Sequence, residues 1–282
     1  MPFPSSSAWP EGWGQRTAVM GVINLTPDSF SDGGLFNTPD RALRQASRQL
    51  ASGASVLDLG AQSTRPGAEE VGAEEEIRRL IPALQRIRAA HPQAVLSVDT
   101  FWAPVAEAAL EAGANWINDV TGGRRDPAML PLVAQAGCPY VLMHSRGDSK
   151  TMDCLTHYGP DVVSDVLKAL DEASDRAEQA GVRRDQLIWD PGLGFAKTTD
   201  QNLMLLQGLE RLVAQGVPLL LGPSRKRFIG AVLEEPRAKA RLWGTAAVCC
   251  RSVAAGVAIL RVHDVAPIRQ VVQMASALWP IG

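Results

Sequence analysis

The sequence is poor in the features that mark several classes of protein. Only four of its 282 residues are cysteine, and none has the spacing of a metal site or a redox motif (Cys138, Cys154, Cys249 and Cys250). We therefore expect small buried thiols and a reducing compartment, not a disulfide framework. No stretch is long and apolar enough to span a bilayer, and residues 1–16 lack the apolar core of a secretory signal. We expect a cytoplasmic protein with no membrane partner.

An excess of charge of one sign is also absent. The formal net charge is −2, from 28 basic and 30 acidic residues, so nucleic acid is not an expected partner. There is no G-x-S-x-G elbow, no H-E-x-x-H motif and no G-x-G-x-x-G motif after an apolar run. Without an evident nucleophile, the chemistry that remains is positioning and charge stabilisation.

Eight short apolar runs are present, and each stops at a polar or charged residue. Strands of a parallel sheet that are buried on both faces read as such runs, and eight of them alternating with helices predict an α/β protein with a (β/α)8 TIM barrel. The runs stop at Asn24, Asp58, Asp99, Asn118-Asp119, His144, Asp190, Ser224 and Arg261-His263. We predict one barrel domain over residues 17–282, preceded by a short arm over residues 1–16 that Trp9 and Trp13 partly order.

The connections between the runs follow a pattern of their own. Helix, glycine and strand recur five times, with the glycine where a left-handed backbone ends the helix. One predicted helix covers Asn202–Gln215 and ends at Gly216. Three irregular stretches follow strands and are predicted to be lids on one face of the barrel: Asp28–Asn37, Gly60–Gly72 and Ser145–Pro160.

Carboxylates and an amide stand at several strand ends, which meet at one face of a barrel. Asp190 opens a Pro- and Gly-rich turn and could grip a planar ring that carries two adjacent N–H donors. Equally, it could cap that turn. Asp99 and Asn118 could add acceptors and a donor, although Asn118 and Asp119 could instead form an Asx-turn pair. Their convergence favours a site, because each unpaired buried polar group costs about 1–3 kcal/mol.

A cationic turn, residues 222–227, leads into a predicted helix at Phe228. Barrels often bind phosphate with the loops after strands seven and eight, and a helix N-terminus strengthens such a site. We therefore predict an anion site formed by Ser224, Lys226, Arg261 and His263. The alternative is a solvated basic turn beside a core-facing histidine, which makes His263 the weaker candidate. Together with the carboxylates, this site suits the departure of an anionic group from a bound planar ring.

From about Val19 to Leu278 the chain resembles the dihydropteroate synthases. The matching motifs, in order, are MGVINLTPDSFSDGG (20–34), DLGAQSTRPG (58–67), SVDT (97–100), IND (117–119), LMH (142–144), DPG (190–192), SRK (224–226) and RVHD (261–264). The resemblance implies condensation of 6-hydroxymethyl-7,8-dihydropterin diphosphate with p-aminobenzoate, giving 7,8-dihydropteroate and pyrophosphate. It also implies a magnesium ion, a homodimer and sensitivity to sulfonamides.

The same resemblance implies roles for individual residues. The pterin edge would be held by Asp99, Asn118, Asp190 and Lys226, and its faces or flank would be contacted by Met143, Phe195 and Arg261. Asn24 would reach the magnesium–diphosphate. The diphosphate and p-aminobenzoate would be bound by Thr64, Arg65, Pro66, Ser224 and His263, with the loops Asp28–Gly34 and Ser63–Gly67 completing the second site. Catalysis would fall to Lys226, Arg261 and Asp99.

The departures from the family pattern are small. Many members have Phe and Gly where Leu193 and Ala196 stand, and Arg227 replaces a smaller residue. Two other interpretations stay open at this stage. A pterin-binding methyltransferase shares the carboxylate-rich site but binds no diphosphate, so the SRK and RVH motifs argue against it. A catalytically silent paralogue is opposed by the intact Asn24, Thr64 and Lys226.

Overall fold

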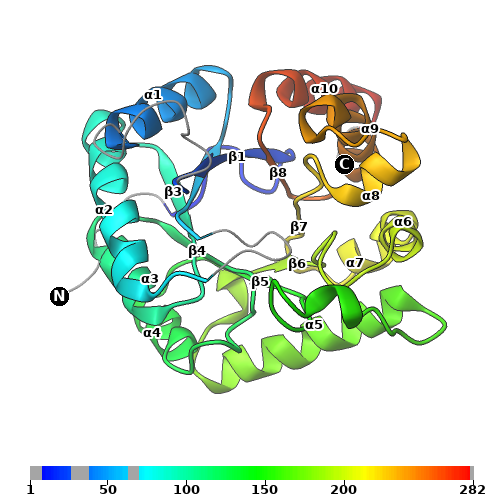
Figure 1. Cartoon of the computed structure of the whole chain (residues 1–282), viewed down its shortest axis with the longest axis horizontal. Coiled ribbons are helices and arrows are strands. Elements are labelled where there is room, and N and C mark those ends of the chain that lie inside the picture. The colour runs from blue at the N-terminus through cyan, green and yellow to red at the C-terminus, as the bar shows by residue number, and fades with distance from the viewer. Residues whose placement is uncertain (1–7, 27–37, 63–69, 280–282) are drawn as a thin grey trace.

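The computed structural model describes residues 8–26, 38–62 and 70–279, within which strands and helices alternate (Figure 1). The strands are β1 (Ala18–Asn24), β2 (Val56–Gly60), β3 (Val95–Asp99), β4 (Trp116–Asp119), β5 (Tyr140–Met143), β6 (Leu187–Asp190), β7 (Leu220–Leu221) and β8 (Ile259–Val262). The helices are α1 (Thr38–Ala51), α2 (Ala73–Ala90), α3 (Ala103–Glu111), α4 (Met129–Ala136), α5 (Val162–Gln179), α6 (Thr199–Gln207), α7 (Leu209–Val213), α8 (Arg227–Val232), α9 (Leu242–Ala254) and α10 (Val265–Leu278). Short 3-10 turns cover Met152–Cys154, Arg184–Gln186 and Ala238–Arg241.

The strands form one parallel sheet that curves into a barrel. Their order is β6-β5-β4-β3-β2-β1-β8-β7, and each pairing is parallel. A single bridge between Trp189 and Leu219 brings β6 beside the start of β7 and joins the two ends of the sheet. The helices surround the strands in Figure 1. The predicted (β/α)8 barrel is confirmed.

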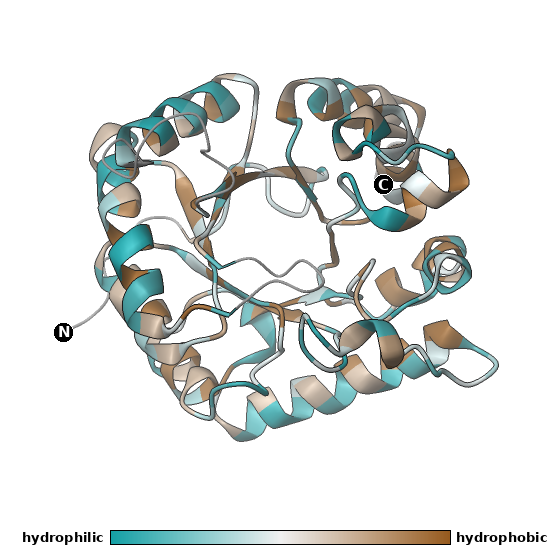
Figure 2. Cartoon of the chain, in the orientation of Figure 1, coloured by the Kyte–Doolittle hydropathy of each residue, from teal (hydrophilic) through white to brown (hydrophobic). Residues whose placement is uncertain are grey.

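Both faces of each strand are buried, which explains the continuous apolar runs. Outward-facing side chains such as Leu57, Ile117 and Leu142 pack against the helices in one large core. Trp189 joins this outer layer and donates its indole N–H to Ser174 on α5 at 2.8 Å. Figure 2 shows the same division, with apolar strands and polar colour on the outer faces of the helices.

The amino-terminal end of the barrel is closed by an apolar floor. Trp9 and Trp13 pack beneath it with ring centroids 5.4 and 5.7 Å from that of Trp116, and the Trp116 indole donates to the carbonyl of Ala8. The arm is therefore packed on the barrel where it is described. The division of the chain at residue 17 stays a prediction. The floor consists of Ala18, Met20, Val56, Val95, Trp116, Val141, Ile188, Leu220 and Ile259.

The predicted helix endings are confirmed, and one predicted helix is wrong. Glycines with φ between 66° and 98° end five helical segments: Gly53, Gly113, Gly137, Gly181 and Gly216. The expected helix Asn202–Gln215 is instead α6 and α7, because Gly208 has a non-helical backbone (φ −97°, ψ 19°). A β-carbon at Gly208 would also lie 2.8 Å from Val163. The first of the two helices begins early because Thr198 and Gln201 form a capping box.

None of the described helices is both long enough and apolar enough to cross a membrane.

Candidate active site

Polar side chains fill the barrel interior above the apolar floor. Each stands two residues after a floor residue of its own strand, and side chains two apart on a strand point to the same face. The interior polar residues of this kind are Asp58, Ser97, Asn118, Asp190 and Arg261. Asp99 ends β3 and pairs in register with Asn118 of β4. The structure therefore brings together the predicted Asp99, Asn118, Asp190 and Arg261 at one end of the barrel.

Arg261 is the centre of this polar layer. Its Nε donates to Asp58 at 2.6 Å and its Nη2 donates to Asp99 at 2.7 Å. Asp58 also accepts from Ser97 at 2.6 Å and from the Asn118 amide at 3.2 Å. Burial alone would lower the pKa of Arg261, but the two carboxylates raise it above its ordinary value. The guanidinium is therefore a permanent charge that is already shared by two aspartates.

Asp58 is a site residue that the sequence analysis did not assign. It has no exposed surface, and it orients Asn118 and Arg261, both of which we had singled out. The available signal was its position at the end of an apolar run. Asp119, by contrast, has the structural role that we considered for it, because it accepts from the backbone N–H groups of Thr121 and Gly123.

Asp190 ends β6 and lies next to the cationic turn, which follows the neighbouring strand β7. One of its oxygens accepts from the Gly192 N–H at 2.7 Å, as in the turn-capping alternative, and no other described residue hydrogen-bonds to this carboxylate. The side chain of Lys226 packs over the backbone of Gly194 and places its ammonium 4.1 Å from the Phe195 ring centroid. Burial lowers the pKa of Lys226 to about 8, with Asp190 acting in the opposite direction. The two elements thus lie next to each other, as the predicted site requires.

The three basic residues of the turn have different partners. Arg225 forms a bidentate ion pair with Asp264 at 2.7 and 3.1 Å, and Arg227 does so with Asp153. Within the described part of the chain, Lys226 is the one basic residue of this turn without a carboxylate ion pair. The geometry therefore singles out Lys226 as the cation available to a ligand.

Ser224 and His263 lie together beside this turn. The Ser224 hydroxyl is 2.9 Å from His263 Nδ1 and accepts from the His263 backbone N–H at 3.2 Å. Burial lowers the pKa of His263 to about 3, and Arg225 and Arg261 lower it further. The imidazole is neutral, so it can offer an anion a hydrogen bond but no charge.

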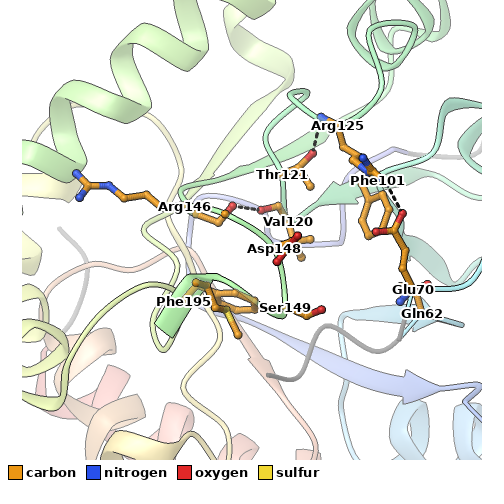
Figure 3. Close-up of a pocket in the computed structure, with 13 residues that line it drawn as sticks. Gln62, Glu70, Phe101, Val120, Thr121, Arg125, Arg146, Asp148, Ser149 and Phe195 are labelled. Carbon is orange, nitrogen blue, oxygen red and sulfur yellow. Dashed lines mark hydrogen bonds and ion pairs between the residues drawn. The ribbon is translucent and has the colours of Figure 1, made fainter. Parts of the chain in front are cut away.

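Two apolar side chains border the same space. Met143 ends β5, is buried, and pairs in register with Asp190. Phe195 belongs to the loop after β6 and also lines a cavity of about 160 Å³ between the loops after β2, β3, β4 and β5 (Figure 3). Its other lining residues were not among the predicted site residues, although eight of them lie in the predicted lids Gly60–Gly72 and Ser145–Pro160: Gln62, Glu70, Phe101, Val120, Thr121, Arg125, Ser145, Arg146, Gly147, Asp148, Ser149 and Met152.

Comparison with known proteins shows what this arrangement is similar to. Residues 20–263 match the family model described as "Pterin binding enzyme". The chain is 48% identical to a dihydropteroate synthase of Synechocystis over 95% of this chain and 92% of that one, and 43% identical to that of Bacillus subtilis over 95% and 90%.

The chain belongs to the dihydropteroate synthase family.

Solved dihydropteroate synthases have the same fold. A Xanthomonas albilineans structure with 4-aminobenzoic acid is 42% identical, with a TM-score of 0.88 over 95% of both chains. Another from that organism, in complex with 7,8-dihydropteroate, is 39% identical, with a TM-score of 0.84 over 95% and 96%. A Yersinia pestis structure with a sulfonamide drug is 37% identical, with a TM-score of 0.88 over 95% and 98%.

Three residues that the family resemblance assigned to substrates lie outside the described residues, namely Thr64, Arg65 and Pro66. The same is true of the predicted lid over residues 28–37 and of most of the lid over residues 60–72. The third predicted lid, Ser145–Pro160, is described. It contains the 3-10 turn Met152–Cys154 and forms one wall of the cavity in Figure 3.

The residues at this end of the barrel would fit a magnesium ion only together with a phosphate ligand. Among residues 8–26, 38–62 and 70–279, no group of three His, Cys, Asp or Glu side chains could hold a metal. Asn24 offers one amide oxygen at the end of β1, beside Gly60. Magnesium keeps several waters and commonly binds one or two protein oxygens together with phosphates. The donor set therefore fits an ion that arrives with a diphosphate.

Proposed function

We propose that the chain catalyses the reaction for which its family is named: 6-hydroxymethyl-7,8-dihydropterin diphosphate and p-aminobenzoate give 7,8-dihydropteroate and pyrophosphate in folate biosynthesis. The chain is a transferase with small-molecule substrates. The observation that carries the proposal is the juxtaposition of Asp190, Asp99 and Asn118 with Lys226 at one barrel opening. Such a site can hold a flat heterocycle beside an anion.

The pterin would bind in the polar layer above the floor. Asp190 and Asp99 accept from its N–H groups, and Asn118 offers an amide to its edge. Lys226 donates to a ring acceptor, while Met143, Phe195 and Arg261 contact the ring faces or flank. The carboxylates match amino and ring N–H donors, which explains why three acidic or amide groups share one small space.

The reaction itself needs charge stabilisation more than proton transfer. As the C–O bond to the diphosphate breaks, positive charge develops on the methylene group of the electron-rich pterin. Lys226 and Arg261 stabilise the departing diphosphate. The hydrogen bond between Ser224 and the neutral His263 uses one of their two protons, so one of the two groups can donate to the diphosphate. Thr64 and Arg65 are proposed as further phosphate contacts. The neutral arylamine then forms the C–N bond and releases its proton to solvent.

p-Aminobenzoate would bind at the outer rim. We place it beside Ser224, with Pro66 and its loop as a cover that excludes water from the methylene cation. A sulfonamide that mimics p-aminobenzoate would compete for the same place, since a Y. pestis relative has been solved as a sulfonamide drug complex.

Asn24 is the residue that would hold magnesium on the diphosphate. The ion, when bound, neutralises part of the phosphate charge. The side chains of Lys226 and Arg261 would neutralise a further part of the phosphate charge.

We also propose a homodimer and a cytoplasmic location. The dimer is supported by exposed apolar side chains on and near α8 and α9, where Val232, Leu233 and Trp243 are 55%, 48% and 79% exposed. Sedimentation velocity tests it. Free thiols at all four cysteines suit a reducing compartment.

One incubation tests the function. The purified chain is mixed with both substrates and magnesium, and 7,8-dihydropteroate and pyrophosphate are quantified. We expect both products in equal amounts, and Lys226→Ala and Asp190→Asn should each abolish pyrophosphate release while the circular dichroism spectrum stays native. Wild-type turnover in either variant would remove that residue from the mechanism. A wild-type chain that binds pterin but releases no pyrophosphate would favour the silent paralogue, and methyl transfer would favour the other rival.

A further inference from the structure

Lys197 is a buried lysine that none of the roles above uses. It follows the loop after β6 and is 9% exposed. Its ammonium lies 2.9 Å from Nδ1 of His144, 3.1 Å from the carbonyl oxygen of Gly192 and 3.1 Å from that of Phe195. Burial lowers the pKa of Lys197 to about 7, with Asp190 opposing. In the charged form the ammonium has three N–H donors, and each donor has an acceptor.

Burying the ammonium of Lys197 costs free energy. A buried charge is tolerated only where it is paired or fully hydrogen-bonded, and here the acceptors are one imidazole and two carbonyls. Burial lowers the pKa of His144 to about 2, with Lys197 and Arg146 lowering it further. His144 is therefore neutral, and its Nδ1 can accept a hydrogen bond from the ammonium.

The two carbonyls belong to the loop that carries two proposed pterin contacts. Asp190 precedes Gly192, and Phe195 supplies the other carbonyl directly. The loop backbone already lies so close to β5 that a β-carbon at Gly192 would be 1.9 Å from the carbonyl oxygen of His144. Lys197 thus fastens both ends of the turn between Asp190 and Phe195 to the end of β5.

A second anchor holds the same loop. Asn202 on α6 accepts from the Gly194 N–H at 2.7 Å and donates to the carbonyls of Lys197 and Thr198. With Gly194 fixed by Asn202, the orientation of the Phe195 ring against Lys226 depends on where Lys197 holds the Phe195 carbonyl.

We propose that Lys197 is a positioning residue for the pterin substrate: by clamping the carbonyls of Gly192 and Phe195 to His144, it fixes the directions of the Asp190 carboxylate and the Phe195 ring. The proposal rests on the proposed function for the identity of the substrate. It assigns Lys197 no contact with either substrate, so its loss should weaken pterin binding specifically and leave p-aminobenzoate binding unchanged.

The test compares Lys197→Met, which keeps an unbranched side chain one atom shorter and without donors, with Lys168→Met, which removes a lysine that is 79% exposed on α5. Calorimetric titration with the pterin diphosphate, and the KM values for both substrates, are measured for each variant and the wild type. We expect the pterin Kd and KM of Lys197→Met to rise about tenfold, as for a contact misplaced by a fraction of an ångström. Its KM for p-aminobenzoate should stay unchanged, and Lys168→Met should match the wild type.

Several outcomes would overturn the proposal. A purely structural role would lower the melting temperature of Lys197→Met and leave the pterin Kd of the folded fraction unchanged. An equal rise in both KM values would likewise reject a pterin-specific effect. If Lys197→Met does not fold, His144→Phe removes one acceptor and should raise the pterin Kd in the same direction by less; an unchanged Kd would reject the clamp. If the wild type binds pterin but forms no product, the proposed function is wrong. The proposal for Lys197 can still be tested in that case, because the comparison of Kd values does not need turnover.

Discussion

Nε of Arg261 lies 2.6 Å from a carboxylate oxygen of Asp58, although the two residues are 203 positions apart in the chain. With Asp99 at 2.7 Å from the same guanidinium, the charge of Arg261 is shared before any ligand arrives. Asp58, Asp99 and Asp190 therefore face two cations, Arg261 and Lys226. An excess of carboxylate around the ring suits a reaction in which the ring carries positive charge.

The Asp58–Arg261 pair should be coupled in stability. Removing one member of a buried pair costs about 3 kcal/mol where it leaves the partner's charge unpaired. Arg261→Met does this to both Asp58 and Asp99, so it should lower the free energy of unfolding by that order. Asp58→Asn leaves Arg261 paired with Asp99 and should cost less, and the double variant should lose less than the sum. Urea denaturation of the four proteins measures this. Strictly additive losses would show that the pair contributes no coupling.

Gly192 should tolerate no side chain. Its φ is +70°, and a β-carbon would lie 1.9 Å from the His144 carbonyl oxygen, so Gly192→Ala must displace the loop that carries Asp190. We expect a loss of about 3 kcal/mol or more in unfolding free energy, together with weaker pterin binding. Gly14→Ala is the matched control, because Gly14 also has a positive φ of 75° but nothing within 4 Å of the added carbon. It should cost about 1 kcal/mol. Equal losses at the two positions would contradict the steric argument.

Lys226 should set an alkaline limit to activity. Its pKa is lowered to about 8 by burial, with Asp190 and Asp99 opposing and Arg261 assisting, so the ammonium is lost as pH rises through that value. We expect kcat/KM for the pterin diphosphate to fall there. In Lys226→Arg the guanidinium stays charged, and the residual activity should show no fall near pH 8. An unchanged midpoint in that variant would assign the limit to another group.

Magnesium dependence should involve Asn24. We expect a chelator to abolish product formation and added magnesium to restore it. In Asn24→Ala the concentration of magnesium for half-maximal rate should rise about tenfold, the lower end of losses seen when metal-site contacts are removed. Asn115→Ala serves as a control, since Asn115 is a buried asparagine that binds Arg88 and the Leu96 backbone away from the site. The assignment fails if the magnesium requirement of Asn24→Ala equals that of the wild type.

Glu76 on α2 should make stability fall as pH rises. It has no exposed surface, and neither of its oxygens makes a well-formed hydrogen bond within the described part of the chain. Burial raises its pKa from 4.5 to about 7, against the opposing effect of Thr100. The folded state keeps this proton between those values and the unfolded state releases it, so the free energy of unfolding should fall by about 3 kcal/mol across that window. Glu76→Gln should remove this fall, whereas the exposed Glu74→Gln should keep it. Urea denaturation at pH 5 and pH 8 decides between them.

Much of this architecture could be predicted from the chain alone, for a physical reason. Strands buried on both faces must be apolar throughout, so their ends stand out, and the ends of parallel strands share one face. Asp99, Asn118, Asp190 and Arg261 were located in this way. The predicted single helix over Asn202–Gln215 was wrong because the backbone of Gly208 is not helical. The spacing of apolar residues does not reveal such a local break.

The specific partnerships could not be predicted. Asp58 looked like any other strand end, and only the folded barrel shows that its carboxylate accepts from Nε of Arg261. Lys197 carried no motif of its own, because its role depends on the carbonyls of Gly192 and Phe195 and on His144, 53 residues away. Contacts of this kind are set by how the barrel closes, and a single sequence does not contain that distance information.

The apolar floor leaves the barrel with a single opening. With Trp9 and Trp13 packed under Trp116, a substrate cannot leave through the amino-terminal end of the barrel. Reactants and products must then pass the same rim in turn, and whichever molecule sits outermost blocks the departure of the one beneath it.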